Sequence, residues 1–170
     1  MEENRKYSNN KEEIYQQLKK EIPFILDASY PLVSNLANFS ALLNQALMNL
    51  NWVGFYLYKK DCLYLGPFQG LPACTRIKMG KGVCGTALQE KMTMVVADVH
   101  QFPGHIACDS ASNSEIVVPI LSKNQYYGVL DLDSFSFSNF DDIDKKYLEE
   151  FVALYLLPLF QDQYDETENY

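Results

Sequence analysis

The spacing of apolar residues changes near residue 50, and this change constrains the fold more than any other feature. Ile14, Leu18 and Ile22 recur every four residues, and a stripe of leucines with one phenylalanine follows over residues 32–50, so two amphipathic helices are expected. The next segments, NWVGFYLYKK and CLYLGPF, are rich in aromatic and β-branched residues and predict a hairpin with a Lys-Asp turn. Helices followed by consecutive strands indicate an α+β fold.

The remaining segments extend this pattern. GKGVCGTALQEK predicts a short helix, and MTMVVADV, EIVVPIL and YYGVLDLDS predict three more strands. A last helix is expected to begin at the acidic residues around Asp141 and to end at Pro158. We therefore expect one domain over residues 11–160, with a central antiparallel sheet flanked by helices, a flexible N-terminus (1–10) and a C-terminal tail (161–170).

The composition limits the partners. With 14 Lys and Arg against 22 Asp and Glu the formal net charge is −8, which disfavours nucleic acid and anionic membranes, because both are bound through basic patches. The hydrophobic content of 48% is that of a folded globule. The longest apolar run, FVALYLLPLF, is shorter than the ~20 residues that span a bilayer. The N-terminal segment lacks the apolar core of a signal peptide, so a cytoplasmic location is expected.

Three of the four cysteines, Cys74, Cys84 and Cys108, fall within one stretch of 35 residues. In a reducing compartment a permanent structural disulfide is disfavoured. The cluster is then core filler, a metal site or a redox relay, and the surroundings of each thiol have to be weighed.

Cys108 has the most polar surroundings of the three. It lies in HQFPGHIACDSASNS, and structureless loops of that length tend to be functional. Buried structural cysteines normally have apolar neighbours, so the context favours a reactive role. The carboxylate of Asp109 would raise the pKa of the Cys108 thiol, which counts against that role.

Cys84 follows a glycine-rich turn at the start of a predicted helix. The positive end of a helix dipole lowers the pKa of a thiol, so local electrostatics make Cys84 the better thiolate. A small residue packed under the sheet fits the same sequence equally.

Cys74 lies in a loop expected over residues 69–79, with Arg76 and Lys78 close by. These neighbours predict a mobile and partly ionised thiol, which suits a cysteine that travels to a sulfenic acid and resolves it. Cys62 opens a strand without such a context, and we interpret it as structural.

Zinc is a further alternative for the thiols. His105 and Cys108 have ligand-like spacing, and Cys74 and Cys84 would complete four ligands. Structural zinc sites usually contain paired CxxC motifs, and the sequence has none, so zinc is disfavoured.

The motif VLDLD places Asp131 and Asp133 on one face of a strand, about 7 Å apart. This face is either solvated or forms the floor of a pocket in which neighbouring carboxylates raise each other's pKa, so that one serves as a general acid. Glu115, at the start of the preceding strand, is a candidate third carboxylate. Trp52 and Tyr56 also share a strand face and are either core residues or the wall of a small cavity.

Taken together, these segments resemble the free methionine-(R)-sulfoxide reductases, a stand-alone branch of the GAF-domain fold. The resemblance is carried by NWVGFYL, GPFQGLPACTRIKMGKGVCG, DVHQFPGHIACDSASNSEIVVPI, GVLDLDS and FSNFDDID, and it covers residues 12–158. It implies a GAF-like fold, a scaffold that hosts many ligands, so the more specific part of the match is the three cysteines together with the acidic strand.

The resemblance also implies a role for each thiol. Cys108 matches the cysteine that attacks the sulfoxide sulfur, Cys74 matches the main resolving cysteine, and Cys84 matches a third cysteine that provides a second resolving route. Local electrostatics favour Cys84 as the nucleophile, and the resemblance moves this role to Cys108. Cys62 lies outside the family pattern.

The resemblance likewise implies a substrate site. The three carboxylates match groups that hold the substrate and its sulfoxide oxygen, and the two aromatic residues match a wall near its methyl group; these residues are Glu115, Asp131, Asp133, Trp52 and Tyr56. The expected activity is reduction of free L-methionine (R)-sulfoxide, with thioredoxin as the external reductant and no metal or organic cofactor. Pairing of the N-terminal helices into a homodimer is compatible with the sequence. The alternatives are a GAF-type small-molecule or redox sensor without turnover and a zinc-stabilised interaction protein.

Overall fold

The computed structural model describes residues 7–104, 110–123 and 125–165. The elements in chain order are α1 (Lys11–Ile25), α2 (Leu32–Ala46), β1 (Leu50–Lys59), β2 (Cys62–Gly70), β3 (Arg76–Lys78), α3 (Gly82–Glu90), β4 (Met94–Val96), a 3₁₀ turn (Val99–Gln101), β5 (Ser114–Leu121), β6 (Tyr126–Ser134), α4 (Asp142–Phe151), a π-helical segment (Val152–Leu156) and α5 (Leu157–Gln163).

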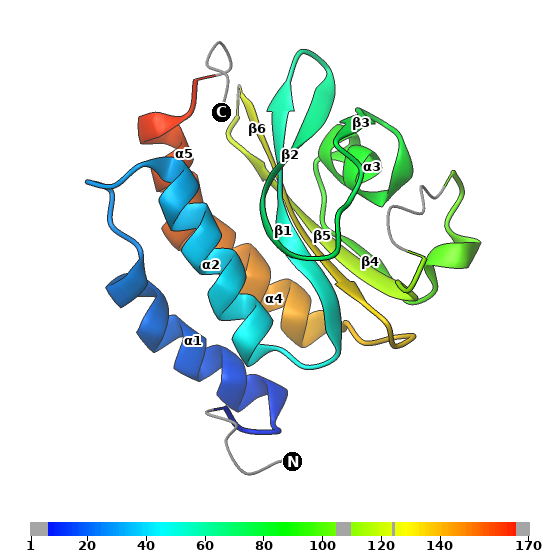
Figure 1. Cartoon of the computed structure of the whole chain (residues 1–170), viewed down its shortest axis with the longest axis horizontal. Helices are drawn as coiled ribbons and strands as arrows, with labels where there is room; N and C mark the ends of the chain where they lie inside the picture. Colours follow the sequence, from blue (N-terminus) through cyan, green and yellow to red (C-terminus); the bar gives the residue numbers. More distant parts are fainter. Residues whose placement is uncertain (1–6, 105–109, 124, 166–170) are drawn as a thin grey trace.

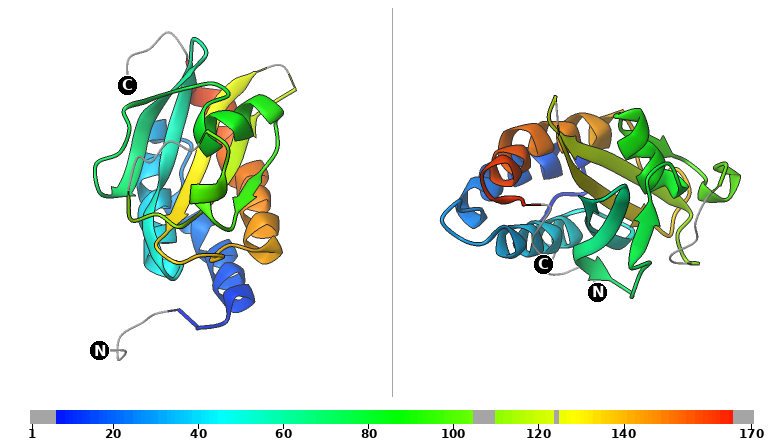
Figure 2. Two further views of the ribbon diagram at one scale, coloured as in Figure 1. Left: turned by 90° about the vertical axis from the view of Figure 1, so that its right-hand side faces the viewer. Right: turned by 90° about the horizontal axis from the view of Figure 1, so that it is seen from above.

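The strands form one six-stranded antiparallel sheet in the order β3-β2-β1-β6-β5-β4 (Figure 1). Helices α1, α2, α4 and α5 lie on one face and α3 lies on the opposite face, as the two rotated views in Figure 2 show. The larger buried cluster joins the helical layer to one face of the sheet, and a smaller one lies between α3 and the other face. The α+β class and the antiparallel sheet flanked by helices are confirmed.

The predicted hairpin is also confirmed. Lys60 and Asp61 connect β1 to β2 with φ values of 47° and 59°, both in the left-handed region. Two consecutive residues with positive φ make the turn that matches the twist of a two-residue hairpin. This turn sets the register of β1 against β2 from Lys59 to Tyr56, and the register then shifts between Tyr56 and Gly54.

The N-terminal side of the helical layer is held by polar contacts. Tyr7 and Asn10 fall in the stretch expected to be flexible, but Tyr7 is buried and the Asn10 side chain caps α1 by accepting a hydrogen bond from the Glu13 backbone N–H. Tyr15 donates a hydrogen bond of 2.8 Å to Asp144 at the start of α4. These contacts attach α1 to the rest of the domain.

The expectation that the last helix ends at Pro158 is wrong. The chain passes from α4 through the π-helical segment into α5, and Pro158 occupies the first turn of α5. A proline lacks a backbone N–H, and the helical hydrogen-bond pattern shifts directly before Pro158, where the Leu157 N–H donates to the Val152 carbonyl five residues back, so the chain stays helical past the proline. The expected loop over residues 69–79 also differs, since β2 extends to Gly70 and Arg76–Lys78 pairs with Cys62–Tyr64.

Within the described ranges, no helix combines the length and apolar character needed to cross a bilayer.

Candidate active site

The α3 face of the sheet brings together side chains from three central strands. Because β6 lies between β1 and β5, Asp133 is paired with both Trp52 and Glu115 in one row across the sheet. Asp131, two residues before Asp133, pairs with Gly54 of β1 in the next row. Side chains two residues apart on a strand share a face, so all these groups are directed to the α3 side. The sequence-based grouping of Asp131 and Asp133 is confirmed.

An aromatic stack borders this row. Trp52 is buried and stacks on Tyr56 with ring centroids 5.8 Å apart, and on Phe68 of β2 with centroids 5.3 Å apart. Gly54 makes room for Phe68, because a Cβ at Gly54 would lie 2.3 Å from the Phe68 Cβ. Phe68 was not identified from the sequence. A glycine in the middle of a strand is the signal that could have pointed to such a close approach.

Helix α3 adds a thiol to the carboxylates. Its residues Ala87 and Leu88 are fully buried against the sheet, and this packing directs Cys84 inward. The Cys84 Sγ lies 3.8 Å from Glu115 Oε1, and one ligand atom each from Cys84, Glu115 and Asp131 lie within 4.8 Å of one another. Three titratable groups from a helix and two strands therefore share one buried volume.

Burial raises the pKa of the two carboxyl groups. The pKa of Asp131 rises from 3.8 to about 7, mainly because its charge is removed from water, while hydrogen bonds with Cys84 and Glu115 oppose the shift. The pKa of Glu115 lies well above its usual 4.5, through burial first and then the negative charges of Asp131 and Asp133. A solvated face is therefore excluded for Asp131, which is 4% exposed, while Asp133 is half-buried. Burial therefore favours the protonated form of both carboxyl groups.

The expected low pKa of the Cys84 thiol is wrong. Burial raises its pKa well above the usual value, and the nearby Asp131 and Glu115 raise it further. Cys84 does occupy the first turn of α3, as the sequence indicated. The dipole of this short helix is outweighed because the thiolate would form out of water beside two carboxyl groups. The alternative interpretation from the sequence, that Cys84 is a small residue packed under the sheet, agrees with its buried position between α3 and the sheet.

Two buried polar atoms at the site have no hydrogen-bond partner within the part of the chain that the structure describes. These atoms are Trp52 Nε1 and Asp131 Oδ1. A buried donor or acceptor left unpaired costs about 1–3 kcal/mol, and such atoms are few in folded proteins. One donor and one acceptor on the same face can pair with a small polar ligand, which recovers this free energy.

The remaining cysteines differ in state. Cys74 is disulfide-bonded, so the expected mobile and partly ionised thiol is not present, whereas Cys62 and Cys84 are free thiols. The backbone carbonyl of Cys74 accepts a 3.1 Å hydrogen bond from the Tyr56 hydroxyl, which places the Cys74 backbone beside the aromatic stack. Cys108 and His105 lie outside the described residues. The disulfide removes Cys74 from the set of four zinc ligands considered from the sequence.

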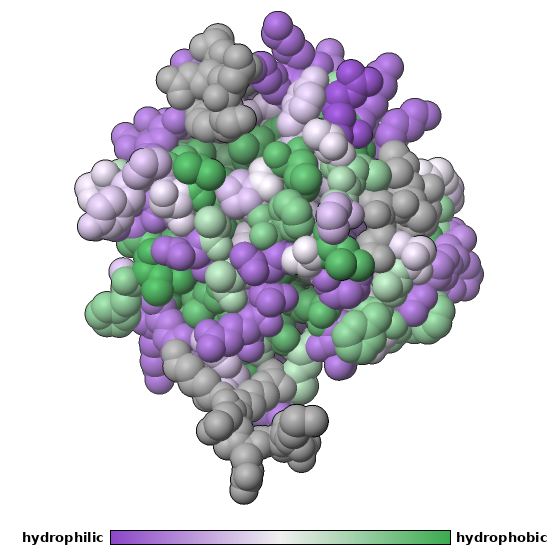
Figure 3. All heavy atoms as spheres, viewed as in Figure 1, coloured by the Kyte–Doolittle hydropathy of each residue, from purple (hydrophilic) through white to green (hydrophobic). Residues whose placement is uncertain are grey.

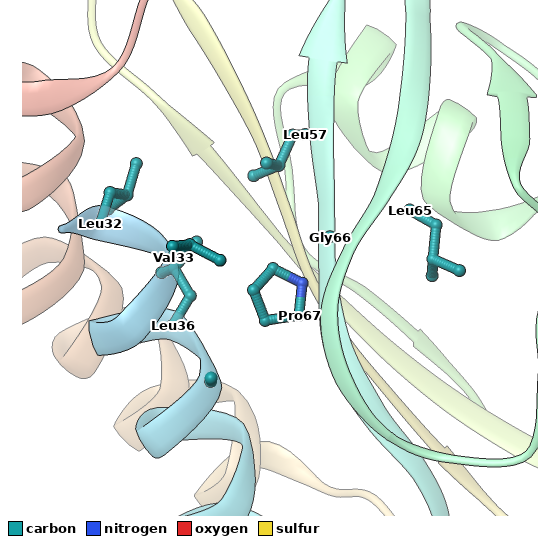
Figure 4. Close-up of a pocket in the computed structure, with 8 residues that line it drawn as sticks. Leu32, Val33, Leu36, Leu57, Leu65, Gly66 and Pro67 are labelled. Carbon is teal, nitrogen blue, oxygen red and sulfur yellow. The ribbon is translucent and has the colours of Figure 1, made fainter. Parts of the chain in front are cut away.

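A pocket lies on the other face of the sheet, between α2 and the β1–β2 hairpin (Figure 4). Its volume is about 300 Å³, and its walls include Leu32, Leu36, Leu57 and Pro67. Figure 3 shows apolar residues at the surface of this side of the molecule, interspersed with hydrophilic ones. Among the described residues that line this pocket, none has a titratable side chain.

The order of the strands in the sheet and the layer of helices on one of its faces are those of a GAF domain. The sequence model of the GAF-domain family matches residues 12–155. The GAF-like fold expected from the sequence is therefore confirmed.

Similar proteins specify the branch of this fold. The chain is 50% identical over 144 residues to a free methionine-R-sulfoxide reductase of Escherichia coli, with 85% of this chain and 87% of the relative covered. It is 46% identical over 153 residues to a free methionine-R-sulfoxide reductase of Saccharomyces cerevisiae, with 85% of each covered. A crystal structure of free methionine-R-sulfoxide reductase from Neisseria meningitidis in complex with its substrate superposes with a TM-score of 0.81 at 42% identity, covering 91% of this chain and 93% of that one. The chain belongs to the free methionine-R-sulfoxide reductase family of GAF domains.

Proposed function

We propose that the protein reduces the (R)-epimer of free L-methionine sulfoxide to methionine. The relatives named above carry this activity in their names, and the Neisseria meningitidis protein was crystallised with its substrate. The observation in this structure that carries the proposal is the pair of unpartnered polar atoms, Trp52 Nε1 and Asp131 Oδ1, beside two carboxyl groups whose pKa is raised by burial. A sulfoxide oxygen needs a proton, and a free amino acid brings both donors and acceptors.

The roles of the binding residues follow from their positions. Trp52 and Tyr56 form an apolar wall for the methyl group of the substrate, since their rings are stacked and buried. The carboxylates Glu115, Asp131 and Asp133 provide the protonated acid and the negative charge that pairs with the α-ammonium group. An internal methionine in a peptide has no such ammonium group, so an acidic buried site favours the free amino acid.

The chemistry begins at the sulfoxide. A protonated carboxyl of the Asp131–Glu115 pair hydrogen-bonds to the sulfoxide oxygen and makes the sulfur more electrophilic as the transition state is reached. The Cys108 sulfur attacks that sulfur, methionine leaves, and the oxygen passes to Cys108 as a sulfenic acid. Activation of the electrophile lessens the need for a strongly lowered thiol pKa at Cys108.

A second thiol then resolves the sulfenic acid. Attack by the Cys74 thiol forms a disulfide and releases water, and the dithiol of thioredoxin reduces this disulfide to complete the cycle. The disulfide-bonded state of Cys74 supports its part in this step. We assign Cys84 to a slower second route, because its raised pKa keeps it protonated. The scheme uses no metal or organic cofactor, and a thioredoxin cycle fits a cytoplasmic location.

Single-turnover and steady-state assays on cysteine variants test the scheme. Cys108→Ser is expected to abolish reduction of free methionine (R)-sulfoxide, whereas Cys74→Ser is expected to release about one methionine per protein rapidly and then to be recycled by thioredoxin only at the much lower rate of the Cys84 route. Cys62→Ser serves as the matched control, since Cys62 is a free thiol outside the carboxyl cluster. Sustained turnover by Cys108→Ser would contradict the assignment.

The sensor alternative is tested in the same assay. A GAF sensor that binds a ligand without turnover would leave methionine sulfoxide unconsumed in the presence of dithiothreitol. The third alternative, a zinc-stabilised interaction protein, requires stoichiometric zinc in the purified protein, which elemental analysis measures. A homodimer stays a prediction, and light scattering of the purified chain tests it.

A further inference from the structure

We propose that Cys84, Glu115 and Asp131 form a site for a thiophilic divalent cation such as Zn²⁺ or Cd²⁺, which acts as an inhibitor rather than as a cofactor. One sulfur and two oxygen ligand atoms lie within 4.8 Å of one another, and all three residues are buried. The second observation is that Asp131 Oδ1 is buried and has no partner among the described residues. A cation provides the partner that this oxygen lacks.

The ligand spacing suits a tetrahedral metal. Zinc binds sulfur at about 2.3 Å and carboxylate oxygen at about 2.0–2.2 Å, which places neighbouring ligand atoms roughly 3.5 Å apart. The Cys84 Sγ and Glu115 Oε1 are already 3.8 Å apart. Because the three residues come from α3, β5 and β6, small side-chain rotations on rigid elements are sufficient to close the site.

The donor set selects the class of metal. A thiolate with two carboxylates suits zinc and cadmium, while magnesium and calcium prefer six or more oxygen ligands and would not use the sulfur. Three protein ligands leave a fourth position for water or a small anion. This set differs from the zinc site considered from the sequence, which required Cys74, His105 and Cys108.

The charge balance also favours a dication. Once deprotonated, the three ligands would carry three negative charges that repel one another in a buried cluster, and a bound dication reduces the net charge to about −1. On binding, the Cys84 thiol loses its proton to solvent as the metal–sulfur bond forms, and any carboxyl proton leaves in the same way. Nothing is oxidised or reduced in this step.

The inhibitory consequence rests on the proposed function. The cation occupies Glu115 and Asp131, the carboxyl groups to which we assign the sulfoxide oxygen. A metal-loaded protein therefore cannot present a protonated carboxyl to the substrate. Metal binding itself does not depend on turnover, so the two proposals can be tested apart.

The test uses the whole chain with its Cys74 disulfide intact, because Cys74 then offers no competing thiol. After chelation and removal of the chelator, Cd²⁺ is added and the thiolate-to-cadmium absorption band is recorded, with Zn²⁺ competing in a second titration. We expect about one equivalent bound. The band should be lost in Cys84→Ser and binding should weaken more than about tenfold in Glu115→Gln. Cys62→Ser, which keeps Cys84, should bind as the wild-type chain does.

Thermal melts establish that each variant is folded, and Glu115→Gln tests the site independently should Cys84→Ser not fold. Absence of the band in the wild-type chain, or a band that survives Cys84→Ser and disappears in Cys62→Ser, would overturn the proposal. Where cadmium binds as expected but methionine sulfoxide is never consumed, the proposed function fails while the metal site stands. Where both hold, Zn²⁺ should inhibit competitively with free methionine sulfoxide.

Discussion

Replacing Asp131 by asparagine removes a carboxyl group that burial perturbs and keeps nearly the same shape. The side chain is 4% exposed, and its pKa rises from 3.8 to about 7 in the folded protein. A folded-state pKa above the unfolded value means that the folded protein binds the proton more tightly. The associated stability is fully present below pH ~4 and is lost as the pH rises through about 7.

The magnitude follows from the size of the shift. Each pKa unit corresponds to about 1.4 kcal/mol, so ionising Asp131 in the folded protein lowers the free energy of unfolding by at most about 4 kcal/mol. Because Glu115 lies in the same cluster and can hold the proton in its place, we expect about 2–4 kcal/mol. The amide that replaces the carboxyl group is neutral at every pH, so Asp131→Asn should have about the wild-type stability at pH 4.5 and exceed it at pH 8.

Urea denaturation of both proteins at pH 4.5 and pH 8 measures this difference. Subtracting the variant from the wild type cancels the titration of groups that do not interact with Asp131, and Asp61→Asn provides the control. Asp61 is exposed in the hairpin turn with φ 59°, a conformation that asparagine tolerates. Parallel pH dependence of Asp131→Asn and the wild type would refute the burial of an ionisable group at this position. The variant should also lose reduction of methionine sulfoxide, since the gain in stability comes from the group that binds substrate.

Two further predictions concern the neighbours of this carboxylate. Gly54→Ala should destabilise the protein by about 1–3 kcal/mol and weaken substrate binding, because the new Cβ would lie 2.3 Å from the Phe68 Cβ and would displace Phe68 from Trp52. Denaturation should show no comparable loss of stability for Gly104→Asn, where the added side chain meets open space. Unchanged stability of Gly54→Ala would contradict the close packing of Gly54 against Phe68. Cys84 should react with iodoacetamide at pH 8 at least about tenfold more slowly than Cys62, because Cys84 is buried and the pKa of its thiol is raised. Peptide mass spectrometry measures the two alkylation rates. Equal rates would show that Cys84 is accessible to solvent.

Local sequence signals were sufficient for most of the fold. Ile14, Leu18 and Ile22 all lie on the buried face of α1, and the Lys60-Asp61 turn forms where it was predicted. The end of the last helix was predicted wrongly at Pro158, because the chain stays helical there through the preceding π-helical segment, which has no simple residue signature. The strand β3 was missed because three residues are too few for alternation to be recognised.

The placement of Asp131 and Asp133 on one face was predictable from the sequence, but the electrostatics around them were not. Alternation along β6 was sufficient to place Asp131 and Asp133 on one face. The pKa of Cys84 is raised by burial and by Asp131 and Glu115, and these groups come close to the thiol only when α3 packs on the sheet. The dipole of α3 considered alone predicts a lowered pKa, which is why the sequence-based prediction was wrong. Phe68 joins Trp52 through strand pairing, which the sequence near either residue does not specify.

The proposed activity of this acidic, thiol-containing face is the reduction of free methionine (R)-sulfoxide. The most direct measurement supplies purified protein and dithiothreitol with free R-epimer, free S-epimer and a peptide containing methionine (R)-sulfoxide at an internal position, and quantifies methionine formed. We expect consumption of the free R-epimer with little or no reduction of the other two. Equal reduction of the peptide, or no consumption of the free R-epimer, would contradict it.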